Sequence, residues 1–501
     1  MNTDERGSRN YVKVALALIV FVYLCVGALY ALKTPDWQVP DEPAHYNYIR
    51  QLAEDGRLPT LDIGDYDQDY MSRLTSERFP PELSLEAVEY EDHQPPLYYV
   101  LATPVYLVFD GALTPLRLFS VVIGAGVVLL AYVVAITIFP ARPLIALGTA
   151  AFVAFLPQHV AMMAGVNNDS LAELLIGVTL WMTVRWVGKD DRCAGRETAL
   201  RDEKRRWVML GVVLGLGLVT KTTFLPIVPV VALAVLLRWW RDGDRTWERL
   251  RRALALVLGP ALLIALPWWL RNFALYGGLD VYGLANHNVV VVGQPRTSEW
   301  VAAYGWRYVL QEGVTTTFQS FWGQFGWMGV LMPTWLYRAL ALCSGVLVVG
   351  IGYTCTCAAL RRECRCWVLQ SPERSGAGLD TTVPGAERSG IGYYPWHRPP
   401  GQVSPRSEAE WDWRIGVLGT TVLWVILAYL YYNCTFVQHQ GRYLFPALIP
   451  IALGVALAVD GLLRLVRWPE RLRPLAFALP YLALVSLDLY ALWRFIIPAL
   501  T

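Results

Sequence analysis

The chain has 501 residues, of which 55% are hydrophobic and 17% are charged, and its formal net charge is +2. Soluble domains carry about 25% charged residues, so the composition excludes an ordinary soluble globular protein. The small net charge gives no argument for a nucleic-acid partner. The 21 tryptophans and 26 tyrosines suit the aromatic belts of membrane proteins.

Apolar segments long enough to cross a bilayer recur along the whole sequence. The first, residues 11–32, lacks a small-residue cleavage motif and is interpreted as a retained signal-anchor. A shorter run with three prolines, residues 95–109, is predicted to lie at the outer surface without crossing. The sequence therefore predicts an all-α integral membrane protein with about eleven transmembrane helices. The other ten runs are 115–139, 143–161, 169–187, 207–223, 225–240, 252–270, 335–360, 412–432, 441–466 and 474–495.

Arginine and lysine set the orientation of these segments, because cytoplasmic loops are enriched in both. All basic loops fall inside if residues 95–109 do not cross. The prediction is a multi-pass protein of the inner (plasma) membrane, with a cytoplasmic N-terminus and an outer C-terminus. A core of residues 1–360 then carries two large outer segments, and a Pro/Gly/Ser/Arg-rich cytoplasmic loop, predicted to be disordered, precedes the C-terminal transmembrane helices. The outer segments are 33–114 and 272–334, the loop is 361–411, and the last helices occupy 412–501.

Ionisable side chains gather in the segments assigned to the outer side. Asp41 and Glu42 are paired acids directly after the first span, and His45 follows one helical turn later. Acids before Pro43 are also typical of an ordinary helix start, so these residues could serve only as caps. Lys221 lies within apolar sequence, where a lysine is costly and indicates a functional role. The other candidates are His93, Gln94, Asn168, Asp169, Arg271, Gln440, Arg442 and Tyr443.

Simple structural interpretations compete for several of these residues. Asn168 and Asp169 could cap a helix, and Arg271 could extend its charge to the membrane surface. Such interpretations do not explain why similar groups recur on the same side of the membrane. Taken together, the residues predict one polar site at the outer membrane surface, with acids for proton transfer and cations for phosphate.

The order of the outer motifs resembles the GT-C superfamily of multi-span glycosyltransferases, which use polyprenyl-phosphate sugars. The group includes protein mannosyltransferases and the aminoarabinose transferase of lipid A, and the chain is most similar to a bacterial membrane protein family with the first and last motifs. The resemblance implies a large first outer loop that contains surface-lying helices. The motifs are Asp-Glu-Pro-Ala-His at 41–45, His-Gln-Pro-Pro-Leu-Tyr-Tyr at 93–99, Asn-Asn-Asp at 167–169, Gly-Leu-Val-Thr-Lys at 217–221 and Gln-Gly-Arg-Tyr-Leu-Phe-Pro at 440–446.

This resemblance implies transfer of a sugar from a polyprenyl-phosphate donor to a cell-envelope acceptor on the outer face, with inversion. Asp41 matches the acidic position and would act as general base, with Glu42 beside it. The acceptor could be a lipid, a glycan or a protein, and membrane lipids surround the protein. The residues expected at the donor phosphate are Lys221, Arg271, Arg442, Tyr443 and Gln440, and the further site candidates are His45, His93, Gln94, Asn168 and Asp169.

Two other classes of function compete with this one. A polytopic transporter or lipid flippase would need polar residues at mid-membrane and repeat symmetry, and the sequence shows no internal repeat. A structural or assembly protein would use the outer polar groups only as helix caps. Substitutions at those groups would then have mild and additive effects on stability.

The sequence indicates no certain cofactor and leaves a divalent cation open. Glu42 and His45 are the candidate ligands near the proposed site. Four cysteines form two Cys-x-Cys pairs, whose spacing differs from a standard zinc finger. A structural metal site and lipidation beside the membrane are the two interpretations of these pairs. The cysteines are Cys355, Cys357, Cys364 and Cys366.

Overall fold

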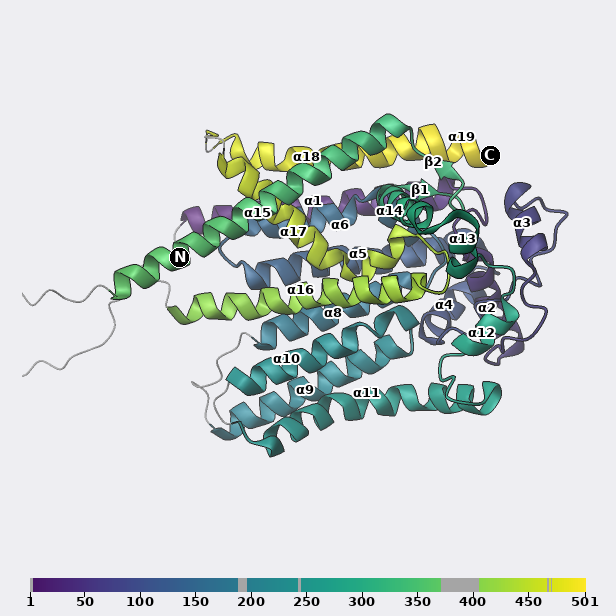
Figure 1. Cartoon of the computed structure of the whole chain (residues 1–501), viewed down its shortest axis with the longest axis horizontal. Coiled ribbons are helices and arrows are strands. Elements are labelled where there is room, and N and C mark those ends of the chain that lie inside the picture. Colours follow the sequence, from purple (N-terminus) through teal and green to yellow (C-terminus); the bar gives the residue numbers. More distant parts are fainter. Residues whose placement is uncertain (1–2, 188–195, 242–244, 371–404, 466–467, 470) are drawn as a thin grey trace, which may run out of the picture.

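The computed structural model describes residues 3–187, 196–241, 245–370, 405–465, 468–469 and 471–501. Long helices run along one axis, and shorter helices gather at one end of the bundle (Figure 1). The only sheet in the described part of the chain is an antiparallel pair of two-residue strands, β1 (Gln324–Phe325) and β2 (Val330–Leu331). The predicted all-α membrane fold is therefore confirmed.

Eight helical segments among the described residues are long and apolar enough to cross a membrane. They coincide with eight of the eleven predicted spans. Short helical turns precede or follow three of them: η2 (Thr222–Phe224), η3 (Gly441–Ala447), and the pair η4 (Leu492–Ile496) and α19 (Ile497–Leu500). The eight main helices are α1 (Thr3–Lys33), α5 (Leu113–Ile138), α10 (Ile227–Arg241), α11 (Trp247–Tyr276), α15 (Thr334–Gln370), α16 (Pro405–Asn433), α17 (Leu448–Leu465) and α18 (Arg473–Ala491).

The other three predicted spans behave differently. Residues 143–161 do not form one straight helix, because α6 (Pro143–Ala154) and α7 (Pro157–Met163) meet at a bend of 62°. Pro157 causes the break: a proline disfavours the helical conformation in the residue before it, and Leu156 is extended. The predicted span 169–187 coincides with α8 (Asp169–Val187), whereas 207–223 begins in α9 (Arg196–Leu218) and continues past its end into η2. Both helices carry charged residues inside their limits. The count of eleven stays a prediction.

The predicted non-crossing segment 95–109 forms α4 (Leu97–Val108), a helix of 12 residues. Such a helix is about 18 Å long, well short of the roughly 30 Å hydrocarbon core. It packs against α2 (Glu42–Asp55) at the end of the bundle where α3 (Gln68–Ser76) and α12 (Leu284–Val290) also lie (Figure 1). The segment is therefore a short helix at the end of the bundle, as its length and prolines predict.

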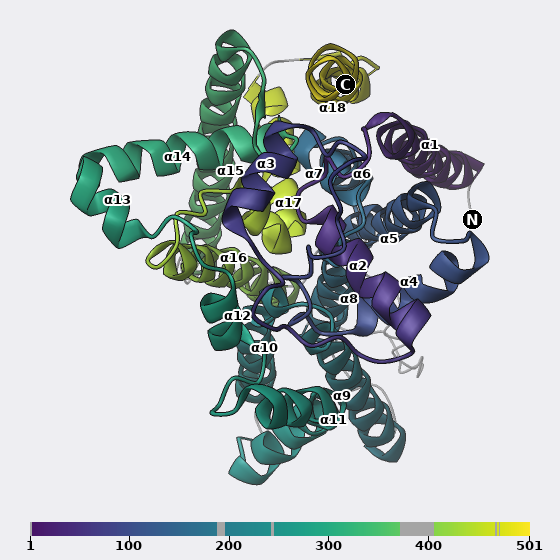
Figure 2. The same cartoon turned by 90° about the vertical axis from the view of Figure 1, so that its right-hand side faces the viewer.

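Two further helices lie across the bundle axis at this end. Figure 2 shows α13 (Thr297–Tyr304) and α14 (Trp306–Trp322) lengthwise, whereas α18 is seen end-on. Both predicted outer segments, 33–114 and 272–334, thus contribute short helices to the same end. The N- and C-termini lie at opposite ends of the bundle (Figure 1). Which end faces the cytoplasm stays a prediction from charge.

The predicted disordered loop 361–411 needs a correction at both of its ends. Helix α15 extends to Gln370 and α16 begins at Pro405. Residues 361–370 contain neither glycine nor proline, and a proline suits the first helical turn. Residues 371–404 lie outside the described residues. So do the side chains of Cys357, Cys364 and Cys366, whereas Cys355 is exposed and free.

A small apolar cluster, separate from the main core of the bundle, holds the first outer segment in place. It joins the start of α2, the helix α3, the segment up to residue 90 and the end of α12. The loop therefore has a core of its own above the membrane helices. Its buried members are Ala44, Met71, Leu74, Phe79, Val88, Tyr90 and Val291.

Candidate functional site

Asp41 and Arg442 form an ion pair at the start of α2. Nη2 of Arg442 lies 2.6 Å from Oδ2 of Asp41, and the Tyr90 hydroxyl donates to Oδ1 at 2.9 Å. The side chains keep exposed fractions of 22% for Asp41 and 10% for Arg442. The ion pair therefore joins two segments that are far apart in the sequence, and its side chains are exposed enough for a ligand to reach them.

Asp41 does not cap α2 with its side chain. No side-chain capping hydrogen bond is made there, and the backbone of Asp41 is left-handed with φ 67° and ψ −4°. Aspartate tolerates this region better than most residues, but a left-handed residue other than glycine is uncommon. The turn is fixed between Pro40 and Pro43 in the sequence. Asp41 therefore occupies the N-cap position of α2, but its carboxylate is not used as a cap.

The charge of Asp41 is set by two opposing effects. Burial raises the pKa of Asp41, but the Arg442 guanidinium and the hydrogen bond from Tyr90 outweigh it and bring the pKa to about 2. An opposite charge at hydrogen-bond distance stabilises the ionised form of a carboxyl group. Asp41 is thus a carboxylate at neutral pH, and its side chain is partly exposed.

A second ion pair joins α8 to the turn after α9. Nζ of Lys221 lies 2.7 Å from Oδ1 of Asp169, and the exposed side-chain fractions are 12% and 23%. Nζ also lies 3.4 Å from Oδ1 of Asn167, which accepts a hydrogen bond from the Asp169 amide. The prediction that Lys221 belongs to a polar group is consistent with this placement, and Asn167 supplies the cap of α8.

His45 lies among the four charged groups. Its Nδ1 is 2.8 Å from the Tyr99 hydroxyl, and its ring is buried. Burial lowers the pKa of His45, the charge of Lys221 lowers it further, and the result is about 3 although Asp41 opposes the shift. Arg442 and Asp169 also act on this pKa. The imidazole is therefore neutral at pH 7, and the members of both ion pairs are near enough to act on its pKa.

Asn168 connects three of the sequence motifs beneath the charged groups. Its buried Nδ2 is 3.4 Å from Oε1 of Gln94, 3.2 Å from the Tyr99 hydroxyl and 3.4 Å from the Thr220 carbonyl. Tyr48 of α2 stacks on Tyr99 with ring centroids 3.7 Å apart. The motifs at 93–99, 167–169 and 217–221, which are distant in sequence, thus converge on one point, as predicted.

Glu42 does not share the environment of Asp41. Its two carboxylate oxygens accept from Nε and Nη2 of Arg117 at 2.8 Å and 2.6 Å, and Oε1 also accepts from the Val166 amide. Glu42 has no exposed side chain, and Arg117 has 1%. Arg117 further donates to the carbonyls of Ala31, Thr34 and Pro35. This placement does not fit a catalytic carboxylate or a metal ligand, and Glu42 instead fixes the turn that holds Asp41.

Arg117 is a positioning residue that the sequence analysis missed. A signal was present, because Arg117 stands inside the apolar run 115–139 and an intramembrane arginine needs a partner.

His45, the other candidate ligand for a cation, has its Nδ1 engaged with Tyr99. The structure therefore gives no support to a cation bound by Glu42 and His45.

Arg271 is separate from the paired charges. Its guanidinium donates to the carbonyls of Leu58 and Pro59 and stacks over the Trp268 ring, with 4.8 Å between Cζ and the centroid. It forms no hydrogen bond or ion pair with Asp41 in the described part of the chain. Arg271 therefore anchors the loop after α2, and its contacts do not support the predicted phosphate role.

Three other candidates border the paired charges. The Tyr443 ring lies under the Arg442 guanidinium, with 5.5 Å between Cζ and the centroid. The Gln440 amide donates to Oε1 of Gln438 at 2.7 Å, within its own loop. The His93 ring contacts the His287 ring, with centroids 4.6 Å apart and ring planes tilted by 48°. Tyr443 therefore belongs to the polar group, whereas Gln440 and His93 line its edge.

Glu91, two residues before the motif at 93–99, is an acid of the same region that was not among the predicted site residues. Its Oε2 is buried and has no hydrogen-bond partner among the described residues. Burial raises the pKa of Glu91, and the negative charge of Asp41 adds to the shift, which brings it to about 8. Glu91 therefore differs from Asp41: burial and a neighbouring negative charge raise its pKa, whereas Arg442 lowers that of Asp41.

A cavity of about 860 Å³ reaches the two ends of the turn that carries Arg442, through the lining residues His439 and Leu444. Its wall is formed mainly by apolar residues of α14, α15, α16 and α17. Lining residues such as Leu310, Val314 and Val348 are themselves exposed on the flank of the bundle. The cavity therefore opens sideways, where lipid would surround the helices.

Residues 76–282 match a protein family described as dolichyl-phosphate-mannose-protein mannosyltransferase. The chain resembles the GT-C glycosyltransferases. The match covers less than half of the chain and includes the motifs at 93–99, 167–169 and 217–221. The motifs that contain Asp41 and Arg442 lie outside it. Comparison of the whole sequence with curated proteins gave no match.

Three solved structures show similar folds at low identity. ArnT from Cupriavidus metallidurans bound to undecaprenyl phosphate is 13% identical over 98% of this chain and 74% of its own, with a TM-score of 0.47. The Archaeoglobus fulgidus oligosaccharyltransferase is 15% identical over 95% of this chain and 52% of its own, with a TM-score of 0.45. The S. cerevisiae Pmt1–Pmt2 complex is 18% identical over 52% and 34%, with a TM-score of 0.35. This chain thus spans about half the length of the oligosaccharyltransferase, and no residue role is carried over from any of the three.

Proposed function

We propose that the protein is a membrane glycosyltransferase that transfers a sugar from a polyprenyl-phosphate donor to a cell-envelope acceptor. The reaction takes place at the end of the bundle that holds α2, α4 and α12, which we assign to the outer face. The observation that carries this proposal is the partly exposed Asp41–Arg442 pair, whose arginine lies on a turn flanked by His439 and Leu444 of the apolar cavity. The family match over residues 76–282 supports the same class of reaction.

The cavity and the cations suit the two parts of such a donor. A polyprenyl chain is apolar and would lie in the cavity, whose wall reaches His439 and Leu444 beside Arg442. The phosphate would then meet the Arg442 guanidinium, which can donate two parallel hydrogen bonds to it. Lys221 has an exposed side-chain fraction of 12% and would supply a second positive charge.

Asp41 is the proposed general base. The acceptor hydroxyl oxygen attacks the anomeric carbon, and its proton passes to the Asp41 carboxylate. The bond between the anomeric carbon and the phosphate oxygen breaks, and the polyprenyl phosphate leaves with the bonding electrons. A single displacement of this kind inverts the configuration at the anomeric carbon.

The Asp41–Arg442 contact also suggests how the base becomes active. A carboxylate with a pKa of about 2 is a weak base. When the donor phosphate draws Arg442 away from Asp41, the pKa of Asp41 rises because burial then acts without its counter-charge. Donor binding thus prepares the base at the moment when an acceptor can be deprotonated.

Asp41→Asn tests this assignment in protein reconstituted in lipid discs with a polyprenyl-phosphate sugar. Asparagine also tolerates the left-handed backbone, so folding should be preserved. We expect the transfer rate to fall by about 10²–10⁴-fold, the usual contribution of a general base, with donor binding retained. Asp110→Asn is the matched control, because Asp110 is an exposed aspartate with φ 49°. Full activity of the Asp41→Asn protein would disprove the base assignment.

Mass spectrometry of cell-envelope glycans, with and without the gene, identifies the sugar and the acceptor. The glycosyltransferase proposal expects one glycan to be missing in the strain without the gene and restored by the natural protein but not by Asp41→Asn. Restoration by both proteins would favour the polytopic transporter or lipid flippase, which needs no base at Asp41.

A further inference from the structure

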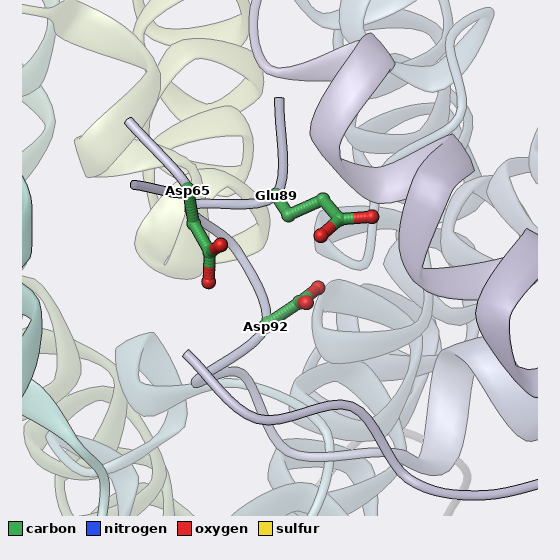
Figure 3. Close-up of side chains that lie close together, drawn as sticks. All are labelled: Asp65, Glu89 and Asp92. Carbon is green, nitrogen blue, oxygen red and sulfur yellow. The ribbon is translucent and has the colours of Figure 1, made fainter. Parts of the chain in front are cut away.

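Three acidic side chains of the first outer segment, none of them Asp41, lie close together. Asp65 precedes α3, and Glu89 and Asp92 lie on the segment that leads to α4. Each offers a carboxylate oxygen, and these oxygens all lie within 4.8 Å of one another. Figure 3 shows the three side chains near one another on loop segments. Ionised carboxylates at such distances repel one another unless a cation or a proton lies between them.

Asp92 gives a second, independent indication of a ligand. Its exposed fraction is 1%, and only one of its oxygens has a protein donor, Nε2 of Gln51 at 2.8 Å from Oδ2. Oδ1 is buried and has no hydrogen-bond partner among the described residues. A buried carboxylate oxygen without a donor carries a large desolvation cost, which a bound cation would offset.

The protein supplies little positive charge to this cluster. Nη2 of Arg50 is 3.6 Å from Oε1 of Glu89, and no other ion pair reaches the three acids in the described part of the chain. The cluster thus has one arginine for three acids, and the arginine is not within hydrogen-bond distance.

We propose that Asp65, Glu89 and Asp92 bind one Ca²⁺ ion. The donor set contains only carboxylate oxygens, which is the preference of hard cations and excludes a zinc-type thiolate or imidazole site. Ca²⁺ binds oxygen at about 2.3–2.6 Å and tolerates irregular geometry, so one ion can bridge oxygens that lie almost 5 Å apart. Mg²⁺ needs about 2.1 Å and near-octahedral geometry, which three carboxylates on irregular loop segments do not supply. Water molecules would complete the coordination.

The ion would connect the loop to the proposed active site. Between the two ligands Glu89 and Asp92 lies Tyr90, whose hydroxyl donates to Asp41. Asp92 is also held to α2 through Gln51. Outside α3, the loop between α2 and α4 has no regular helix or strand among its described residues. Bound Ca²⁺ would therefore stabilise this loop and fix the position of Tyr90, a positioning role that goes beyond the proposed sugar transfer.

Calcium titration of the full-length protein in lipid discs tests the site directly. After removal of cations with a chelator, we follow binding by calorimetry and the thermal unfolding midpoint without donor or acceptor. Ca²⁺ up to about 10 mM covers the 10⁻⁴–10⁻³ M range of extracellular modules. We expect one bound ion and a midpoint that rises by several degrees, with a smaller rise in Mg²⁺.

Two variants and one control make the result specific. Asp92→Asn should lose the binding heat and the rise in midpoint. Asp65→Asn should lose both as well, and because Asp65 is less buried, this variant still tests the site if Asp92→Asn fails to fold. Glu82→Gln changes an exposed acid of the same loop and should leave both unchanged. No binding to the natural protein, an equal response to Mg²⁺, or an unchanged response in Asp65→Asn would overturn the proposal. Sugar transfer is not measured, so this outcome is independent of the proposed function.

Discussion

Asp41 and Glu42 are adjacent in the chain, yet their ion pairs lie in opposite surroundings. We call Glu42–Arg117 the sealed pair, because both side chains have at most 1% exposure and Arg117 also satisfies three backbone carbonyls. We call Asp41–Arg442 the open pair, because its two side chains keep 22% and 10% exposure. The sealed pair has little hydrogen-bonding capacity left, whereas Nε of Arg442 has no partner in the described structure.

This difference separates structural charges from charges that can change partners. A buried ion pair with every donor and acceptor used resists any ligand, and breaking it leaves an uncompensated charge. A partly exposed pair can exchange its internal partner for a phosphate or a hydroxyl group. The sealed pair therefore ties the end of α1 and the turn before α2 to residue 166. The open pair is the one that can bind a substrate group.

Arg117→Leu should produce the largest effect on stability. The substitution leaves the Glu42 carboxylate buried without its cation and frees three carbonyls, which costs about 3–5 kcal/mol for a buried pair. We expect the unfolding midpoint of the protein in lipid discs to drop sharply and the yield of folded protein to fall. An unchanged midpoint would contradict the distinction between sealed and open pairs.

The double variant Glu42→Leu/Arg117→Leu is the control for that prediction. Removing both charges eliminates the unpaired carboxylate, and apolar replacement of a whole buried pair is often nearly neutral. The double variant should therefore recover part of the stability that Arg117→Leu loses. A loss equal to or larger than that of the single variant would indicate that the carbonyl contacts of Arg117, rather than its pair with Glu42, dominate.

Arg442→Lys should have the next largest effect, on donor binding rather than on stability. Lysine keeps the charge but loses the forked donors that match a phosphate, and a charged hydrogen bond contributes about 1.5–3 kcal/mol. We expect the KM for the donor to rise about 10- to 100-fold, measured by transfer kinetics. Arg464→Lys, at the Asp460 cluster near the other end of α17, is the control and should leave KM unchanged. An unchanged KM in Arg442→Lys would remove Arg442 from the donor site.

The sequence was sufficient for the fold class, because apolar length and basic loops are local signals. It also indicated which motifs share one end of the bundle, and Asp41, Lys221 and Arg442 do lie there in two ion pairs. The bend before Pro157 was missed because hydropathy over 143–161 is continuous, although the proline was visible. Hydropathy and composition thus predict where helices lie better than they predict the breaks within them.

Pairing could not be predicted from the sequence. Asp41 and Glu42 look equivalent in a list of residues, and only the placement of Arg117 and Arg442 separates them. Arg271 was expected with the cations because it ends an apolar run, but the structure places its donors on the carbonyls of the loop after α2. Long-range partners decide such roles, and a single sequence holds no direct record of them.

Lys221→Gln should weaken donor binding less than the Arg442 variant. Lysine acts as a single point charge and is already paired with Asp169 at 2.7 Å, so part of its charge is engaged before a ligand binds. We expect a rise in the donor KM of roughly 3- to 10-fold, about 1 kcal/mol, with a small change in the unfolding midpoint. A larger effect than that of Arg442→Lys would reverse the ranking of the two cations.

The smallest effect, a shift in a titration curve, tests the electrostatic basis of the open pair. Arg442 holds the pKa of Asp41 at about 2 against burial, so the carboxylate should stay ionised as the pH falls to about 4. In Arg442→Gln the main lowering effect is lost, while burial, which raises the pKa most, and the smaller effect of the Tyr90 hydrogen bond remain, so the pKa of Asp41 should rise above its ordinary value of 3.8. Infrared difference spectra against the matching Asp41→Asn proteins would then show a carboxylate that takes up its proton at a higher pH. A general base works only when deprotonated, so residual transfer by Arg442→Gln should fall with acid before that of the natural protein does. If Asp41 took up its proton at the same pH in the natural protein and in Arg442→Gln, Arg442 would not control the pKa of Asp41.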